Sequence, residues 1–435
     1  MRHGIALDTI ACHDCELQQR VPVLPPGGKA VCARCKMTIA RNPVDPIDRP
    51  LALAIAAAVV FLIANLTPLM GMSVAGLDSS TTILGGARET WLRGSELTAV
   101  SVAFCAVVAP GVFIAFMLLL LFAARTAPAP RWVGRMLRIA TSVQPWSMSE
   151  VMLLGILVAL IKVSQFATVV PGVGLFALGV LVVLLAALGS TFDNHVIWQR
   201  VVWADGTLPQ GVAPADAKPS EAPPVTGQES ARRDLVSCTT CGLLSRPAAH
   251  GQAGHCPRCG AALTTPTHAS IQTTWALVIA AAVLYIPANS LPVLVSTSLG
   301  SSQSDTLISG VAYLYDSGSW PLALIVLIAS VIVPLGKLAA LAYLLITVQL
   351  GSVRNNQDRT RLYRLVELVG RWSMLDVFVD SFIVALVQLE PLMSVRPGTG
   401  VALFMSVVVL TVFAARSFDQ RLIWNAGRFK QMQHG

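Results

Sequence analysis

The cysteines are the residues of this sequence whose type and spacing point most directly to chemistry. Eight of the nine form two sets of paired Cys-x-x-Cys turns, with 16 and 14 residues between the pairs. The sets are Cys12, Cys15, Cys32 and Cys35, and Cys238, Cys241, Cys256 and Cys259. Two such turns can place four thiolates at the corners of a tetrahedron, which predicts two structural Zn²⁺ sites. Gly242 and Gly260, each directly after a cysteine pair, permit the tight turn that this geometry needs.

Other chemistry stays open for these cysteines. Tetrahedral sulfur coordination also suits iron, as in a rubredoxin-type centre, and a redox dithiol is a third interpretation. Disulfides are disfavoured if the modules lie in the reducing cytoplasm. Such small modules bury little core, so metal binding would supply their folding free energy. A closed site leaves no position for substrate, so its role is either docking on the cytoplasmic side or stabilisation of the start of the first helix of each unit. Cys105 lies in an apolar segment and is interpreted as a packing residue.

Apolar segments dominate the rest of the chain. Hydrophobic residues make up 54% and charged residues 12%, whereas soluble proteins contain about 25% charged residues. A membrane span needs about 20 mostly apolar residues. We expect eight spans, near 51–70, 97–123, 149–168, 173–192, 275–295, 320–347, 374–393 and 399–416. Residues 1–50 contain no apolar stretch, so no signal peptide is expected.

Basic residues predict the orientation, because cytoplasmic loops carry an excess of Lys and Arg. Of the 31 basic residues, 26 lie in the N-terminal tail, the 124–147 and 348–373 loops, the 193–274 linker and the C-terminal tail. Both termini and both cysteine modules are therefore predicted to be cytoplasmic. The net charge of +8 reflects this topology and anionic lipid, and no nucleic-acid partner is expected.

The two halves of the sequence are copies of one unit. Shifting the sequence by 224 to 226 residues aligns the cysteines, Pro110 with Pro334, and the Trp-Ser-Met elements at 146–148 and 372–374. Four spans per copy is an even number, so both copies should have the same orientation. The predicted fold class is an all-α polytopic membrane protein made of two tandem units, each a small four-cysteine zinc ribbon plus about four spans. The predicted order is a zinc ribbon (1–48), a transmembrane unit (49–203), a flexible linker (204–236), a second ribbon (237–268), a second transmembrane unit (269–427) and a tail (428–435).

Polar side chains inside the spans are candidate functional residues, because an ionisable group at the bilayer centre costs about 2.5–3.5 kcal/mol. The second copy offers Lys337, Asp376, Ser330, Ser373 and Thr411 as a polar cluster. The first copy offers Glu150, which matches Asp376, and Lys162, which lies where the second copy has Gln388. Lys337 matches Phe113, so more function is expected in the second copy. In the alternative interpretation, the acidic residues lie near the interfaces and only contact water.

Two basic amphipathic stretches, 131–145 and 358–371, are expected to lie on the cytoplasmic lipid surface, or else to contact a partner protein. In them Arg135 and Arg138 match Arg361 and Arg364. Enzyme motifs are missing from the sequence. No Walker A, His-Glu-x-x-His or Gly-x-Ser-x-Gly motif occurs, and Gly172-x-Gly174-x-x-Ala177 lies between two spans. The chain is therefore not expected to be an enzyme.

Duplicated four-cysteine modules, each followed by four spans and by Trp-Ser-Met-x-(Glu/Asp)-Val at 146–151 and 372–377, resemble the paraquat-inducible protein A (PqiA) family, including its LetA (YebS) branch. The resemblance covers nearly the whole chain. It implies an inner-membrane subunit of a lipid-transport system that works with a periplasmic MCE-domain tunnel protein. The alternatives are a redox protein with iron in the cysteine sites, and a proton-coupled small-molecule carrier.

Overall fold

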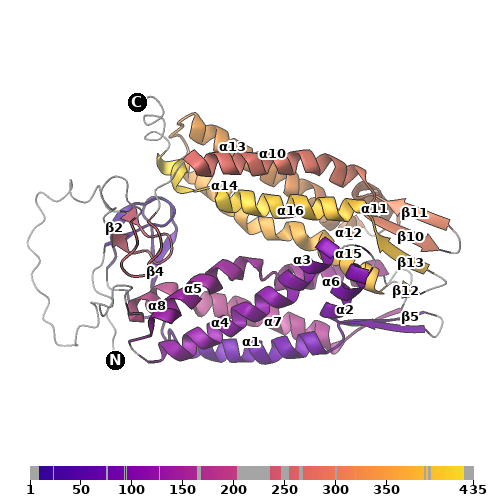
Figure 1. Cartoon of the computed structure of the whole chain (residues 1–435), viewed down its shortest axis with the longest axis horizontal. Coiled ribbons are helices and arrows are strands. Elements are labelled where there is room, and N and C mark those ends of the chain that lie inside the picture. The colour runs from indigo at the N-terminus through magenta and orange to yellow at the C-terminus, as the bar shows by residue number, and fades with distance from the viewer. Residues whose placement is uncertain are drawn as a thin grey trace, which may run out of the picture.

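The structure is a computed structural model. It describes residues 9–22, 24–74, 77–92, 94, 96–126, 128–163, 168–202, 236–245, 254–263, 268–298, 301–318, 320–386, 388–389 and 393–425. Helices dominate these residues, and two small antiparallel sheets lie at the end of the molecule opposite the cysteine modules (Figure 1). The prediction of an all-α fold is therefore corrected to a mostly helical fold with short strands. The predicted linker, 204–236, lies almost entirely outside the described residues.

The described residues of the first copy contain eight α-helices with two irregular turns between them. The α-helices are α1 (Asp48–Leu66), α2 (Ile83–Leu92), α3 (Glu96–Ala103), α4 (Ala109–Ala124), α5 (Arg131–Val143), α6 (Ser149–Val163), α7 (Val173–Thr191) and α8 (Asn194–Arg200). A π-helical turn, η1 (Phe104–Val108), joins α3 to α4, and a 3-10 turn, η2 (Gln144–Trp146), joins α5 to α6.

The second copy repeats this order. Its helices are α10 (His268–Ser290), α11 (Leu307–Asp316), α12 (Trp320–Leu327), α13 (Val333–Gln349), α14 (Asn356–Gly370), α15 (Leu375–Leu386) and α16 (Thr399–Ser417). The turns η3 (Ile328–Ile332) and η4 (Arg371–Met374) correspond to η1 and η2. Helices α1 and α10 both run from the cysteine modules toward the sheets, which gives the two copies one orientation (Figure 1).

Short strands follow the first helix of each copy. In the first copy β5 (Met70–Val74) pairs with β6 (Leu77–Thr81) and β7 (Thr168–Pro171). In the second copy β10 (Leu294–Ser298) pairs with β11 (Ser301–Asp305) and β13 (Met393–Pro397), and β12 (Gln388–Leu389) pairs with β13. All of these pairs are antiparallel. Each sheet therefore joins the end of a first helix to the segment before a last helix.

Seven helical segments in the described part of the chain are long and apolar enough to span a membrane. The predicted span at 374–393 is not among them, because α15 has only 12 residues and the described residues after it include strand β12 and the start of β13. In the first copy α6 has 15 residues and reaches span length only together with α5, as Arg131–Ile161. The prediction of eight full-length spans is thus not confirmed. The apolar pattern could not distinguish a helix from a strand at the end of a span.

The short helices α6 and α15 pack against each other between the two copies (Figure 1). A Cβ atom added to Gly155 of α6 would lie 2.8 Å from the Cβ atom of Phe378 on α15. Small residues allow helix backbones to approach closely in this way. One buried core cluster includes Met152 and Ile156 of α6 with Phe378 and Phe382 of α15. The hydrophobic core is therefore continuous across the repeat boundary.

The π-helical turns occur at matching places, each just before a proline. Pro110 and Pro334 lie in the first turn of α4 and α13, directly after η1 and η3. Proline has no N–H to complete the i to i−4 hydrogen bond, so the preceding turn must adjust, and π-turns of this kind are frequent at functional sites. Ser330 lies in η3, where the first copy has Ala106.

Candidate metal centres and a buried lysine

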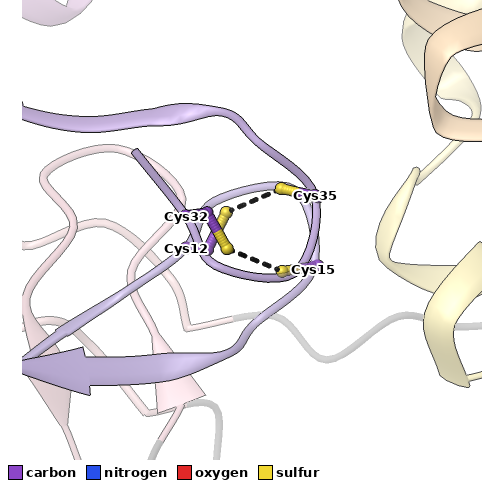
Figure 2. A group of neighbouring side chains, drawn as sticks. All are labelled: Cys12, Cys15, Cys32 and Cys35. Atoms are coloured by element: carbon purple, nitrogen blue, oxygen red, sulfur yellow. Dashed lines mark hydrogen bonds between the residues drawn. The ribbon is translucent and has the colours of Figure 1, made fainter. Parts of the chain in front are cut away.

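Each predicted cysteine set forms a compact cluster. The four sulfur atoms of each set lie within 4.8 Å of one another. In the first cluster Cys12 Sγ lies 3.4 Å from Cys35 Sγ, and Cys15 Sγ lies 3.5 Å from Cys32 Sγ (Figure 2). All of these cysteines are free thiols. Sulfur atoms at the corners of a tetrahedron around Zn²⁺, with bonds of about 2.3 Å, would be about 3.8 Å apart. The donor set therefore fits a metal ion in both modules.

Hairpins and tight turns hold these cysteines. Strands β1 (Thr9–Ala11) and β2 (Gln18–Arg20) flank the first pair, and β3 (Lys29–Val31) and β4 (Thr38–Arg41) flank the second. In the second module β8 (Val236–Ser237) pairs with β9 (Leu244–Ser245). Gly242 and Gly260 have φ of 73° and 69°, as predicted, whereas Glu16 and Lys36 take this left-handed conformation in the first module.

Local hydrogen bonds favour a thiolate in the first cluster. Burial disfavours the charged form of Cys32, but hydrogen bonds from the backbone of Cys35 and Arg34 outweigh it and lower the pKa of the Cys32 thiol to about 6. Arg34 also donates to the carbonyl oxygen of Cys15 at 2.6 Å, and Arg258 donates equivalently to Cys241 at 2.6 Å in the second module. Metal ligation requires thiolates, which the lowered pKa of Cys32 favours, whereas burial raises the pKa of the Cys35 thiol to about 11.

The first cysteine module packs against the second transmembrane unit. Arg364 of α14 donates through Nε to the Asp14 carboxylate at 3.0 Å and through Nη1 to the carbonyl oxygen of Cys35 at 3.3 Å. The Asp14 side chain is only 3% exposed. Burial alone would raise the pKa of Asp14, but hydrogen bonds from His13 and Arg364 outweigh it and lower this pKa. Asp14 therefore remains ionised within this contact.

Further contacts extend the same interface to the segment after α16. Arg421 Nη1 lies 3.2 Å from Glu16 Oε1, and Asn425 donates to Glu16 Oε2 at 2.9 Å. The Arg34 guanidinium lies over the Trp424 ring, 4.3 Å from its centroid. The first cysteine module therefore also contacts the segment 421–425, which follows α16.

The second cysteine module packs in the same way against the first unit. Arg138 of α5 donates through Nη2 to the carbonyl oxygen of Cys259. Cys238, Cys241 and Cys256 share a buried cluster with Trp198 of α8. Each module therefore contacts the other copy's unit. The modules also meet, because His13 Nε2 lies 3.2 Å from the carbonyl oxygen of Thr239.

This arrangement changes the interpretation of the two basic amphipathic stretches. They form α5 and α14, and Arg135 and Arg361 on them are exposed. Arg138 and Arg364 contact the cysteine modules, and the expected contact of these helices with lipid or a partner stays a prediction. The sequence already aligned these two arginines, but Asp14, the carboxylate partner of Arg364, carried no recognisable signal.

Lys337 is a cation buried inside a candidate span, only 2% exposed. From α13 its Nζ donates to the Thr411 hydroxyl of α16 at 2.8 Å and to the Gly370 carbonyl oxygen at the end of α14 at 3.5 Å. Thr411 in turn donates to the Val408 carbonyl oxygen at 2.9 Å. The structure thus brings together two of the predicted polar residues.

The two predicted serines, Ser330 and Ser373, are also buried, and they differ in their hydrogen bonds. Ser330 is fully buried and donates to the Val326 carbonyl oxygen at 2.6 Å, within its own helix. Ser373 is 1% exposed, and its hydroxyl has no hydrogen-bond partner among the described atoms. A buried hydroxyl without a partner is costly, which singles out Ser373 as a polar group available to a ligand or water.

The remaining predicted polar residues lie outside this cluster, or their side chains lie outside the described part of the structure. Glu150 lies in the first turn of α6 and is exposed. The side chains of Asp376 in α15 and Lys162 in α6 lie outside the described residues. Asp380, one turn beyond Asp376, is 9% exposed. Cys105 is buried in an apolar cluster, as expected of a packing residue.

Comparisons with known proteins follow the repeat. The family model described as Paraquat-inducible protein A matches residues 47–202 and 271–427. "Intermembrane transport protein PqiA" of Escherichia coli (strain K12) is 31% identical over 423 residues, covering 97% of each chain. "Lipophilic envelope-spanning tunnel protein A" of the same strain is 30% identical over 95% of this chain and 91% of the relative. A "Probable intermembrane transport protein" of Haemophilus influenzae is 28% identical over 95% of each chain. No solved structure matches the chain.

The two matched segments coincide with the two helical units and leave out both cysteine modules. Full-length relatives named as transport proteins are consistent with the absence of enzyme motifs in the sequence. Seven candidate spans make the chain a multi-pass membrane protein. The chain belongs to the Paraquat-inducible protein A family.

Proposed function

We propose that this protein is the inner-membrane subunit of an intermembrane lipid-transport system. In this proposal it passes phospholipid or another lipophilic molecule to or from a periplasmic MCE-domain tunnel protein. The names of the relatives, which refer to intermembrane transport and to an envelope-spanning tunnel, support this role. A duplicated membrane unit without enzyme motifs is also consistent with transport.

The observation that carries the proposal is the buried ammonium group of Lys337. Its described contacts are two neutral oxygen atoms, from Thr411 and Gly370. A cation held in a span by neutral acceptors can still attract an anionic group, such as the phosphate of a lipid. We assign Lys337, Thr411, Ser330 and Ser373 to the polar wall of a lipid pathway, together with Asp376. Glu150 and Lys162 are assigned to the corresponding part of the first unit.

The cysteine clusters take a structural role in this proposal, with one Zn²⁺ in each. They and both chain termini lie in the cytoplasm, where thiols stay reduced. Most of the basic residues lie on this side, as the positive-inside rule requires. The sheets then lie at the periplasmic end of the molecule, where a tunnel partner would bind.

The test is lipid transfer with purified components. Vesicles containing the full-length protein and a labelled phospholipid are mixed with the soluble domain of the MCE-domain protein from the same bacterium. We expect labelled lipid on the partner only when this protein is present in the vesicles. Equal transfer from protein-free vesicles would contradict the proposal. A dependence on a proton gradient, with a water-soluble solute as the cargo, would instead identify a small-molecule carrier.

A further inference from the structure

The first unit contains a cavity of about 420 Å³ beside the first cysteine module. It lies between strand β4 of that module and helices α4, α5, α7 and α8. Its apolar part is lined by Phe113, Met117 and Leu188, and its polar part by Arg41, Thr141, Gln144, Asp193, Asn194 and His195. This volume falls within the range of about 300–1,000 Å³ that is typical of small-molecule sites. The lining is amphipathic, so a water-soluble ligand would leave one part of it unmatched.

A second cavity of about 180 Å³ adjoins the first and shares Arg41, Phe192 and Asp193 with it. It adds the basic residues Lys29 and Arg49. Arg49 is paired with Asp45 at 2.9 Å, whereas Arg41 donates a long hydrogen bond of 3.5 Å to the Ser190 carbonyl oxygen. Lys29 and Arg41 take part in no described ion pair, and the carboxylate that lines both cavities, Asp193, accepts a hydrogen bond from the His195 backbone N–H at 2.8 Å.

The depth of the larger cavity matches half of a bilayer. Phe113 lies 11 residues before the end of α4 at Ala124, a rise of about 16 Å at 1.5 Å per residue. Half of a hydrocarbon core is about 15 Å thick. The cavity therefore extends from the cysteine module at the membrane surface toward the bilayer midplane.

The repeat allows the position of Phe113 to be compared with the equivalent position in the second copy. Phe113 occupies the place that Lys337 occupies in the second copy. The second unit holds its cation there against Thr411 and Gly370. The first unit instead has the buried ring of Phe113 at this place, in the lining of the cavity, and its cations lie at the module, nearer the membrane surface. The two copies thus differ in how they would hold an amphiphile.

We propose that this cavity binds one anionic phospholipid of the adjacent leaflet, with an acyl chain along Phe113, Met117 and Leu188 and its phosphate at Arg41 and Lys29. Arg is suited to phosphate because its planar guanidinium donates two hydrogen bonds at once. The inference rests on the proposed lipid-handling function and adds the lipid class and a loading position. Free phosphate shares the headgroup chemistry but does not use the apolar wall.

Native mass spectrometry of the full-length protein in micelles tests this inference. The probes are phosphatidylglycerol, the zwitterionic phosphatidylcholine and inorganic phosphate. We expect a retained phosphatidylglycerol molecule and weaker retention of phosphatidylcholine. Arg41→Gln should weaken phosphatidylglycerol binding about tenfold, since it removes a charge-assisted hydrogen bond, and Arg41→Lys should retain most of it. Arg20→Gln, an exposed residue of the same module that lines neither cavity, is the matched control.

A second pair of variants tests the apolar part. Met117→Trp should fill the cavity and abolish retention, whereas Leu119→Trp, on the exposed face of the same helix, should leave it unchanged. The inference is overturned if the wild type retains no phosphatidylglycerol, if Arg41→Gln and Arg20→Gln bind equally, or if Leu119→Trp loses lipid as Met117→Trp does. Displacement of the lipid by an equal concentration of phosphate would identify a soluble-anion site and also overturn it.

These outcomes are separable from the proposed function. Binding is measured on the isolated protein, whereas transport requires vesicles and a partner. Lipid transfer by the wild type together with normal binding by Arg41→Gln would reject the loading site alone. Weakened binding by Arg41→Gln in a protein that transfers no lipid would reject the proposed function and keep the site.

Discussion

Arg138 and Arg364 occupy equivalent positions in the two copies, and each donates to the carbonyl oxygen of the last cysteine of the other copy's module. Arg364 contacts Cys35, and Arg138 contacts Cys259. At the cysteine end of the molecule, the module of each copy therefore contacts a helix of the other copy. A metal ion in one module would stabilise the contact between the two copies, as well as the hairpins around it.

The crossed contact predicts a selective effect of Arg364→Met. It leaves Asp14 buried without its arginine, and hydrogen bonds to charged groups contribute about 1.5–3 kcal/mol each. We expect hydrogen exchange in residues 9–41 to accelerate about tenfold or more. Arg361→Met, which removes an exposed arginine paired only with Asp358, should leave exchange unchanged. Equal exchange in both variants would show that Arg364 does not fasten the module.

The cysteine geometry predicts two metal ions per chain, measured by elemental analysis of the purified protein. Cys35→Ser should reduce the content to one ion and weaken the module's contact with α14, whereas Cys105→Ser should leave two ions because Cys105 packs in the apolar core. Zinc is the expected element. A reducible iron centre would reject the structural-zinc assignment, and two retained ions in Cys35→Ser would reject the ligand set.

The sequence predicted local features better than contacts between the copies. Cysteine spacing was sufficient for both clusters, because four ligands in two short turns leave little geometric freedom. The polar pair of Lys337 and Thr411 was also anticipated, since a buried cation in an apolar helix needs an acceptor. The crossed contact was not anticipated, because nothing in the alignment of Arg138 with Arg364 says which module each arginine reaches.

The strands were also missed. Apolar residues near the ends of the predicted spans, such as Val169 and Val395, are compatible with a helix or a strand. These segments form strands because they pair with β5 or β10, which are far away in sequence. The predicted span at 374–393 was overestimated for this reason. Local hydropathy reports burial, whereas strand pairing depends on a distant partner.

The close approach of α6 and α15 predicts that Gly155→Leu separates the two copies. A Cβ atom at this position already lies 2.8 Å from the Cβ atom of Phe378, so a larger side chain must displace α15. Overpacking of this kind costs about 1–3 kcal/mol. We expect a lower midpoint of thermal unfolding in detergent. Gly179→Leu on α7 is the matched control, because a Cβ atom there meets no atom within 4 Å. Equal midpoints of unfolding in the two variants would show that the contact between the copies does not depend on the close approach at Gly155.

The most direct test of the account is the initial rate of phospholipid transfer to the periplasmic partner by vesicles containing Lys337→Met. Methionine keeps the length and apolar character of the side chain but removes the ammonium that contacts Thr411. We predict a rate at least about tenfold below wild type, as expected for loss of a buried charged contact, with unchanged amounts of folded protein and substantial activity in Lys337→Arg. Transfer by Lys337→Met at the wild-type rate would contradict the assignment of this lysine to the lipid pathway.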